Sequence, residues 1–531
     1  MFYDRGSAAD YDAWASLGNP GWAWDDLHPY FKKARSEARI AENFSPPAQD
    51  YADEFDISWD NQAHGYGGPI QSSYPPFQFP AIKLFFQAWH SLNVTTPQDP
   101  AAGDKAGVFW APSCLDPKDQ TRSYARTAHY DRVIGTRTNY HLITCSAVQR
   151  ILVDGNKAIG VELVDRGSNR TRTVYAKKEV VLAAGSTHSP QILQLSGIGP
   201  DHISTSLGIK HHVDLPGVGQ NFQDHPTVYT TYEFKSPPFP TTDTLATNQT
   251  YADEQLQLYW SKRQGPYTIV NQGGNTVTFL PLPNITAGYQ SIIDFAMSQS
   301  IPSLYPNVPN GTVLAGYEVQ RSLILQLYTS SSTSVQETGW NSGSTIPITL
   351  VKPLSHGSVQ INTTNILEAP VIDFGTLTDP TDLETLISSL RINRAAIATP
   401  AMQELDPVEL SPGANLTTDS ELRNALRRLI QPNYSHPCCT CAMMPKELGG
   451  VVGPDLKVYG VENLSIVDAS IMPLIPAAHL MSTVYAVAEK VSHSNLNPSF
   501  LPCPLHSRAD PADMMQLIQA ADLIKARHGL A

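Results

Sequence analysis

The most regular alternation of hydrophobic and polar positions lies between residues 148 and 176. Three apolar stretches, at 148–153, 159–164 and 173–175, are separated by an Asp-Gly pair and by a polar turn at 166–170. Alternation with a period of two residues, interrupted at such turns, is typical of half-buried strands joined by hairpins. The pattern therefore predicts a three-stranded antiparallel meander.

Two further segments have the pattern of a buried parallel strand followed by a helix. Residues 179–185 form an apolar run, and a helix is predicted at 189–195. Residues 464–467 form a second short apolar strand that ends at Asp468, and a helix is predicted at 477–492, after a proline. Continuous apolar strands are expected where helices cover both faces of a sheet. Such strand–turn–helix units are characteristic of dinucleotide-binding domains.

The middle of the chain, from about 226 to 434, has a different texture. Strand-like stretches at 322–328 and 346–352 alternate with loops rich in Pro, Ser and Thr, and a helical pattern covers 382–398. This indicates an antiparallel sheet with helices beside it, which we interpret as a substrate-side domain. In the tail, apolar residues at helical spacing between 514 and 524 predict one more helix.

The predicted fold class is α/β, as an α+β composite of a Rossmann-like domain and an antiparallel-sheet domain. The chain has 531 residues, which is more than one core usually supports. Its 36 basic and 49 acidic residues give a net charge of −13, and no long Lys/Arg run occurs. This argues against a nucleic-acid or anionic-membrane partner. No apolar stretch reaches the length of about 18 residues needed to span a membrane, so we expect a small-molecule partner.

Asn-x-Ser/Thr sequons are more frequent than the composition explains. About four would be expected by chance, whereas ten occur, at Asn43, Asn93, Asn169, Asn248, Asn284, Asn310, Asn362, Asn415, Asn433 and Asn463. The excess suggests a glycoprotein whose parent is secreted or passes through the secretory pathway. The chain itself shows no charged leader followed by an apolar stretch, and so no signal peptide.

Three of the six cysteines, Cys438, Cys439 and Cys441, lie close to His436. Six cysteines are too few in so long a chain for a disulfide-built fold, although one bridge is compatible with an oxidising compartment. A metal site at this cluster is an alternative. It lacks support because no second Cys/His pair with ligand spacing occurs elsewhere.

Several ordered motifs resemble one family, the flavin-dependent glucose-methanol-choline oxidoreductases, and within it the fungal aryl-alcohol and glucose oxidase-like branch. The motifs are RGSAADYDAW at 5–14, GSTHSPQILQLSGIGP at 185–200, LPGVGQNFQDHP at 215–226, and SHPCCTCAMM, VYGVENLSIVDASIMP and PAAHLMSTVYAVAEK between 435 and 490. The resemblance covers nearly the whole chain. It implies FAD as the cofactor, a small organic alcohol as the substrate, and oxygen or a quinone as the electron acceptor. The oligomeric state stays open.

The resemblance also implies a division into domains. Residues 1–45, 130–225 and 435–496 correspond to the FAD-binding domain, and residues 46–129 and 226–434 to the substrate domain. A tail with a helix occupies 497–531.

His436 and His479 match the catalytic positions of the family. Hydride transfer from an alcohol requires a base that takes the hydroxyl proton, and histidine has a suitable pKa. The resemblance assigns His436 as this base and His479 as the partner that orients the alcohol and the alkoxide. Both histidines must then converge on one pocket. Without the resemblance, each of them would be interpreted as a structural histidine.

Five further positions match flavin-contacting residues of the family. The resemblance places the backbone of Leu480 and Met481 at the pyrimidine side of the flavin, near a helix start whose amides stabilise the anionic reduced ring. Asp468 and Ala469, at the end of a parallel strand, resemble the family's flavin-contacting pair. Val148 resembles the position that meets the adenine.

Two departures from the family pattern bear on activity. No GxGxxG turn, which holds the flavin pyrophosphate at a helix N-terminus, occurs in the chain. We therefore expect the pyrophosphate-binding segment to lie in a missing amino-terminal part. Cys439 stands where the family usually has Gly. The main functional hypothesis is oxidation of a primary, aryl or polyketide-derived alcohol in fungal secondary metabolism. The alternatives are a redox-neutral cyclase of the versicolorin B synthase type on the same scaffold and an inactive truncated form.

Overall fold

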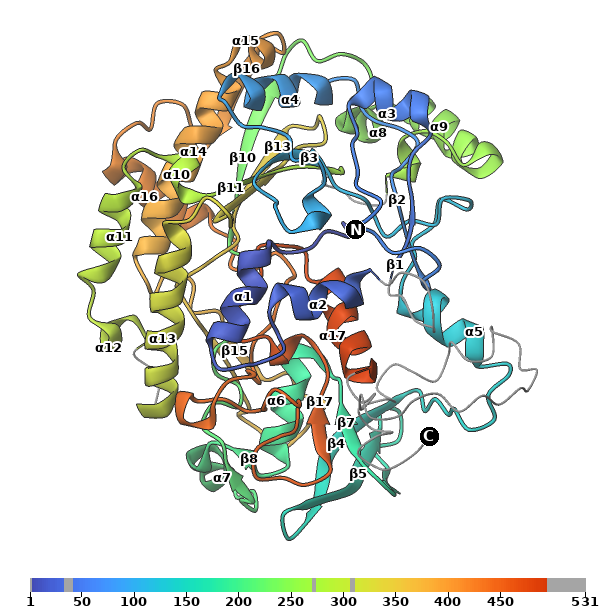
Figure 1. The fold of residues 1–531 in the computed structure, drawn as a ribbon, viewed down its shortest axis with the longest axis vertical. Coiled ribbons are helices and arrows are strands. Elements are labelled where there is room, and N and C mark those ends of the chain that lie inside the picture. Colours follow the sequence, from blue (N-terminus) through green and yellow to red (C-terminus); the bar gives the residue numbers. More distant parts are fainter. Residues whose placement is uncertain (1, 33–41, 270–273, 306–310, 494–531) are drawn as a thin grey trace.

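The computed structural model describes residues 2–32, 42–269, 274–305 and 311–493. A six-stranded antiparallel sheet occupies one half of the molecule, and the three-stranded meander lies in the other half (Figure 1). Helices α1 (Ala8–Ser16), α2 (Trp24–Phe31) and α17 (Met481–His493) lie between them. The α/β composite predicted from the sequence is therefore confirmed, whereas the residue limits of the two domains stay a prediction.

The six-stranded sheet has the strand order β16-β10-β13-β12-β11-β3. Its strands are β16 (Pro407–Ser411), β10 (Thr227–Phe234), β13 (Thr345–Leu350), β12 (Gln336–Gly339), β11 (Thr276–Leu280) and β3 (Gly107–Trp110). Every neighbouring pair is antiparallel. This confirms the antiparallel sheet expected in the middle of the chain and adds one strand, β3, from the first quarter.

Two helices cover one face of this sheet. Helix α14 (Thr381–Ile397) confirms the helix predicted at 382–398, and α16 (Asp419–Leu429) begins at a capping box in which Thr418 and Glu421 bond each other's backbone amides. Both pack on β10 and β13 through a small apolar core that includes Val228. Since side chains alternate between the two faces of a strand, the neighbours of Val228 along β10 point to the opposite face of the sheet.

The other half contains the meander and the two strand–helix units. Strands β4 (Ser146–Asp154), β5 (Lys157–Asp165) and β6 (Thr171–Tyr175) pair antiparallel as predicted. Strand β7 (Val180–Leu182) pairs parallel with β17 (Leu464–Ile466), and α6 (Gly185–Leu195) follows β7 directly. The parallel pairing of these two strands brings the two predicted units together.

Two expectations were wrong. The strand-like stretch at 322–328 is the last part of helix α13 (Gly311–Tyr328). The helix predicted from 477 begins only at Met481, because side chains of the amino-terminal region and of Lys105 bond the backbone before it. Lys105 Nζ donates to the carbonyl of Ala477 at 2.9 Å, and the amide of Ala477 donates to the carboxylate of Asp10 at 3.3 Å. The helix predicted between 514 and 524 lies outside the described residues.

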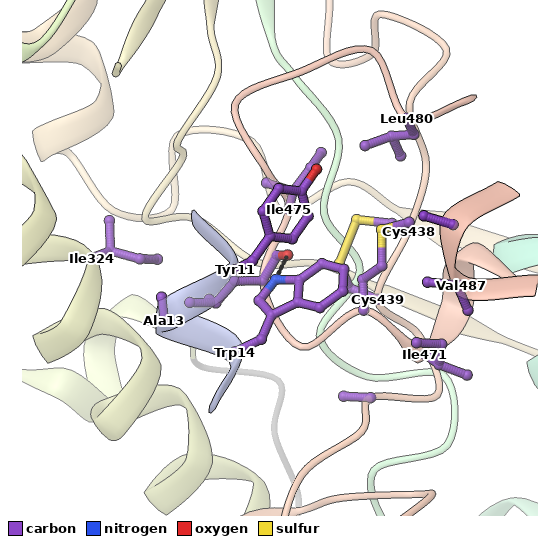
Figure 2. Packing of buried hydrophobic residues seen from close by; sticks show 14 of the residues in the cluster. Tyr11, Ala13, Trp14, Ile324, Cys438, Cys439, Ile471, Ile475, Leu480 and Val487 are labelled. Atoms are coloured by element: carbon purple, nitrogen blue, oxygen red, sulfur yellow. Dashed lines mark hydrogen bonds between the residues drawn. A yellow bond between two sulfur atoms is a disulfide. The ribbon is translucent and has the colours of Figure 1, made fainter. Parts of the chain in front are cut away.

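The amino-terminal segment packs against the carboxy-terminal block. Tyr11 bonds the hydroxyl of Thr483 at 2.8 Å, and Trp14 Nε1 donates to the carbonyl of Leu474 at 2.9 Å. Figure 2 shows Tyr11 and Trp14 beside the disulfide-bonded Cys438 in one buried cluster. Along the described ranges, no helix combines the length and the apolar character needed to cross a bilayer.

The remaining α-helices and β-strands of the described chain lie around these elements. They are β1 (Glu42–Ser45), α3 (Gln49–Phe55), β2 (Ile70–Ser73), α4 (Ile82–Ser91), α5 (Asp131–Val133), β8 (Ile198–Gly199), α7 (Asp201–Ser206), β9 (Val213–Asp214), α8 (Thr242–Thr247), α9 (Gln249–Lys262), α10 (Leu282–Ile285), α11 (Tyr289–Met297), α12 (Ile301–Leu304), β14 (Ser358–Gln360), β15 (Val371–Asp373) and α15 (Pro400–Gln403).

Candidate functional site

A cavity of about 820 Å³ lies between the six-stranded sheet and the carboxy-terminal block. Its wall on the sheet side includes Tyr229 of β10, Trp340 after β12, and Pro347 of β13. The opposite wall is formed by the segment 433–436 and by residues 479–481. The cavity therefore lies where the two halves of the fold meet.

His436 and His479 both line this cavity. Their ring centroids are 5.1 Å apart, and the rings are nearly perpendicular, with an interplanar angle of 87°. The chain brings them together although neither lies in a regular element. The expectation that the two histidines face one cavity is met, whereas their catalytic roles stay predictions.

Buried charges hold His479. Its Nδ1 lies 3.0 Å from Asp4 Oδ1, and its ring packs against Phe2 at a tilt of 36°, with centroids 4.3 Å apart. Lys105 donates to the other oxygen of Asp4, and both residues are almost fully buried. Burial opposes a charge on His479, but the neighbouring carboxylates, Asp4 first, raise its pKa above the ordinary histidine value. The protonated form of His479 is thereby more favoured than that of a free histidine.

His436 has a different environment. Its Nδ1 lies 3.0 Å from Nδ1 of the fully buried His225. The carboxylate of Asp224 accepts the backbone amides of Tyr434 and His436, both at 3.0 Å, which fixes the segment that carries the histidine. Burial lowers the pKa of His436 to about 3, and the positive charge of His479 acts in the same direction. His436 is therefore neutral near pH 7.

Leu480 and Met481 also line the cavity, whereas the contacts of their backbone with a flavin stay a prediction. Met481 is the first residue of α17, whose first turn contains no acidic residue. The partial positive charge of this helix end therefore faces the cavity, with the carboxylate of Asp4 bonded to His479 just before it. This environment fits a flavin ring, which gains negative charge when it is reduced.

The other three predicted flavin contacts lie outside the cavity lining. Val148 is half-buried on β4, and Ala469 is half-buried and accepts the amide of Cys439 at 3.1 Å. Both oxygens of Asp468 are bonded within the protein, to Ser189 at 2.6 Å and to the amide of Ser470 at 2.8 Å among others. The carboxylate of Asp468 thus acts as a cap here. Contacts of these three residues with a flavin stay a prediction.

The cysteine cluster is a buried part of the core. The sulfurs of Cys438 and Cys439 are joined in a disulfide, and Cys441 is a buried free thiol. Cys439 has a φ of 82°, in the left-handed region where glycine is favoured, which is consistent with the glycine usual at this position. Within the described ranges, no three His, Cys, Asp or Glu side chains are grouped so that they could hold a metal ion.

Sequence reasoning missed four residues that support the two histidines. Asp224 and His225 lie in the motif at 215–226, directly before its final proline, so an Asp-His pair there was a usable signal. Asp4 and Lys105 gave no signal in the sequence. They lie 475 and 374 positions before His479, and only the tertiary fold brings them to it.

Comparisons with known proteins agree with this arrangement. Sequence profiles of GMC oxidoreductases match residues 1–227 and residues 353–488. The dehydrogenase xptC of Emericella nidulans is 38% identical over 494 residues, which cover 93% of this chain and 78% of that protein.

Two solved structures are similar over most of their length. The FAD-dependent oxidoreductase from Chaetomium thermophilum is 42% identical, with a TM-score of 0.91, and the match covers 100% of this chain and 85% of that one. A fungal aryl-alcohol oxidase is 36% identical, with a TM-score of 0.84, over 92% of this chain and 82% of that one. These matches indicate FAD as the cofactor. Taken with the profiles that match both ends of the chain, they show that this protein belongs to the GMC oxidoreductase family.

Proposed function

We propose that this protein oxidises a small organic alcohol, primary, aryl or polyketide-derived, by hydride transfer to FAD. The observation that carries the proposal is the pair of histidines in one cavity, where one ring is favoured neutral and the other protonated. Acid–base chemistry on a single oxygen atom needs such a division of roles.

Each histidine then has a distinct task. When bound, FAD accepts the hydride that leaves the alcohol carbon. His436, in its neutral form, takes the hydroxyl proton and becomes an imidazolium that carries a proton on both ring nitrogens. Its Nδ1–H then donates to Nδ1 of His225, 3.0 Å away, which stabilises the charge. His479 orients the alcohol and places positive charge beside the oxygen that becomes an alkoxide.

The known relatives support an alcohol as substrate in general terms. One similar structure is described as a fungal aryl-alcohol oxidase, and the similar Emericella nidulans protein is described as a dehydrogenase. The aromatic side chains of Tyr229, Trp340 and Tyr434 around the cavity suit an aryl or polyketide-derived substrate. We propose oxygen or a quinone as the acceptor, and a role in fungal secondary metabolism.

The test is anaerobic flavin reduction in stopped flow, with a chain extended by a GxGxxG-bearing segment and loaded with FAD. His436→Ala should lower the reduction rate by roughly 10²- to 10⁴-fold, the usual effect of losing a general base. The loss should shrink as the pH rises, because hydroxide partly replaces the base. His202→Ala, at an exposed histidine of α7, is the control and should leave the rate unchanged.

Two outcomes would change the assignment. Unchanged reduction in His436→Ala, together with a comparable loss in His479→Ala alone, would move the base to His479. Product formation while the flavin spectrum stays oxidised under argon would favour the redox-neutral cyclase.

A further inference from the structure

The segment that carries His436 continues directly into a disulfide. Cys438 and Cys439 are neighbours in the chain, and a bond joins their two sulfurs. His436 precedes the first of them by two positions, with Pro437 between. A disulfide between adjacent residues closes a ring that contains only one peptide group, so it restricts the backbone of both cysteines. Pro437 fixes one further dihedral angle between this ring and His436.

Cys439 has a backbone conformation that a residue with a side chain rarely adopts. Its φ of 82° lies in the left-handed region, which is open to glycine but costs free energy in other residues. Such a conformation persists only where the surrounding structure holds it. The disulfide to Cys438 acts at this residue. Without the covalent ring, only hydrogen bonds would hold the backbone of Cys439 against its preference for negative φ.

Hydrogen bonds connect the ring to two stretches of the candidate site. The amide of Cys438 donates to the carbonyl of Gln223 at 3.0 Å, and the amide of Cys439 donates to the carbonyl of Ala469 at 3.1 Å. Gln223 lies two positions before His225, the residue whose ring contacts the proposed base. A change of backbone conformation at Cys439 therefore displaces the segment that lies between these two stretches.

The disulfide lies in the core, closed to solvent. Both of its cysteines are 0% exposed, and Figure 2 shows them beside Trp14 in the buried cluster. A reductant therefore reaches the bond only when the segment opens locally. Cys441, two positions farther along, is a buried free thiol. Burial raises its pKa, so the thiol stays protonated and does not exchange with the disulfide.

We propose that Cys438 and Cys439 form a redox modification site that controls the position of His436. In the oxidised state, the disulfide keeps Cys439 in the left-handed conformation and His436 at the cavity. A dithiol reduces the site: the bond between the two sulfurs breaks, each sulfur takes up one electron and one proton, and the dithiol becomes a cyclic disulfide. The backbone of Cys439 then relaxes, and His436 loses its fixed position. The inference rests on the proposed function and deepens it, because it names a regulation of the same site.

The first test identifies the bond in the 531-residue chain. The chain is purified without reductant, equilibrated with oxidised glutathione, unfolded in excess iodoacetamide and digested with trypsin. The peptide 429–446 contains Cys438, Cys439 and Cys441. It should carry one alkyl group, at Cys441, and three after dithiothreitol. Three groups before reduction, or a single group at Cys438 or Cys439, would overturn the proposal.

The second test follows the position of the segment by hydrogen exchange, without cofactor. Dithiothreitol should raise the exchange rate of the amides of His436, Cys438 and Cys439 by about tenfold or more, because their hydrogen bonds open more often. The meander of β4, β5 and β6 is the internal control and should exchange as before. Equal exchange in the oxidised and reduced chain overturns the proposal. A rise along the whole chain overturns it as well, because it indicates loss of the fold rather than a local change.

Two variants separate positioning from mere stabilisation. Cys439→Gly removes the disulfide but tolerates the left-handed conformation, so the segment should stay protected and should not respond to dithiothreitol. Cys439→Ser removes both, and its segment should exchange rapidly with and without the reductant. The matched control is Cys145→Ser, at an exposed free cysteine, which should respond to dithiothreitol as wild type does. Rapid exchange in Cys439→Gly would contradict the role of the left-handed conformation and overturn the proposal.

The third test uses the extended, FAD-loaded enzyme and separates this inference from the proposed function. After treatment with dithiothreitol and its removal under argon, substrate should reduce the flavin roughly 10- to 100-fold more slowly, as expected when a catalytic group loses its position. Reoxidation with oxidised glutathione should restore the rate. Equal rates in the oxidised and reduced enzyme overturn the inference and leave the proposed function intact. If His436→Ala reduces flavin at the wild-type rate, the proposed function fails, while hydrogen exchange still decides whether the disulfide positions the segment.

Discussion

His356 makes the stability of the fold sensitive to acid. Its side chain is fully buried, and neither ring nitrogen has a hydrogen-bond partner in the described part of the chain. The ring packs against Tyr317 and Tyr305, with centroids 5.0 Å and 6.4 Å away. Burial lowers the pKa of His356 to about 3 from its ordinary value of 6.5, so the fold holds the ring in its neutral form.

The sign and size of the effect follow from proton linkage. Between pH 6.5 and about pH 3 the unfolded chain binds the proton that the fold excludes. The stability contributed by neutral His356 is therefore complete above pH 6.5 and is lost as the pH falls through this window. Each pH unit below the ordinary pKa costs about 1.4 kcal/mol, so the loss between pH 7 and pH 5 is about 2 kcal/mol.

The perturbation is His356→Phe, which keeps an aromatic ring against Tyr317 and removes the titration, with His356→Leu as a second variant. Urea unfolding, followed by tryptophan fluorescence at pH 7 and pH 5, should show a smaller loss of stability in these variants than in wild type, by about 2 kcal/mol. The contributions of other titrating groups are the same in wild type and variant, so they cancel when the two acid losses of stability are subtracted. His202→Asn, at an exposed histidine, should leave the pH dependence unchanged. The same acid loss in wild type and His356→Phe would refute the reasoning, because the fold would then accommodate the charge.

Two further predictions follow from the sequence. The 531-residue chain should purify colourless, because it contains no GxGxxG turn to hold the flavin pyrophosphate; stoichiometric flavin in the absorbance spectrum would contradict this. Protein produced through a fungal secretory pathway should carry N-glycans at sequons with exposed asparagines, such as Asn284 and Asn415. Peptide mass spectrometry after enzymatic deglycosylation measures this, and unmodified asparagine at both sites would contradict a secreted glycoprotein.

The elements that could be predicted are those whose hydrophobic pattern matches their burial. The meander and the parallel pair of β7 and β17 are of this kind. The hydrophobic pattern of helix α13 does not match its burial, because polar residues occupy positions on its buried face. Arg321 is buried in an ion pair with Asp379 at 2.7 Å, and Gln320 donates to the carbonyl of Pro473 at 2.6 Å. These two residues interrupt the helical period and leave an apolar run that resembles a strand.

The residues of the candidate site also divide into those that the sequence could predict and those that it could not. His436 and His479 could be predicted because they lie in motifs that resemble a family. Their supporting groups, His225 and Asp4, reach them only through tertiary contacts. Neither periodicity nor local spacing carries information on such contacts, and the register of the six-stranded sheet, which places Tyr229 and Pro347 side by side at the cavity, is equally invisible in one sequence.

The packing of the amino-terminal segment on the carboxy-terminal block also constrains how the chain folds. The partner of Asp4, His479, is 475 residues away. At a synthesis rate of about 5 to 20 residues per second, the first segment waits roughly 25 to 95 s for it. During this time Phe2, Tyr3 and Trp14, all buried in the fold, have no completed core to enter. Folding of this half is therefore completed only after the carboxy-terminal block has been synthesised.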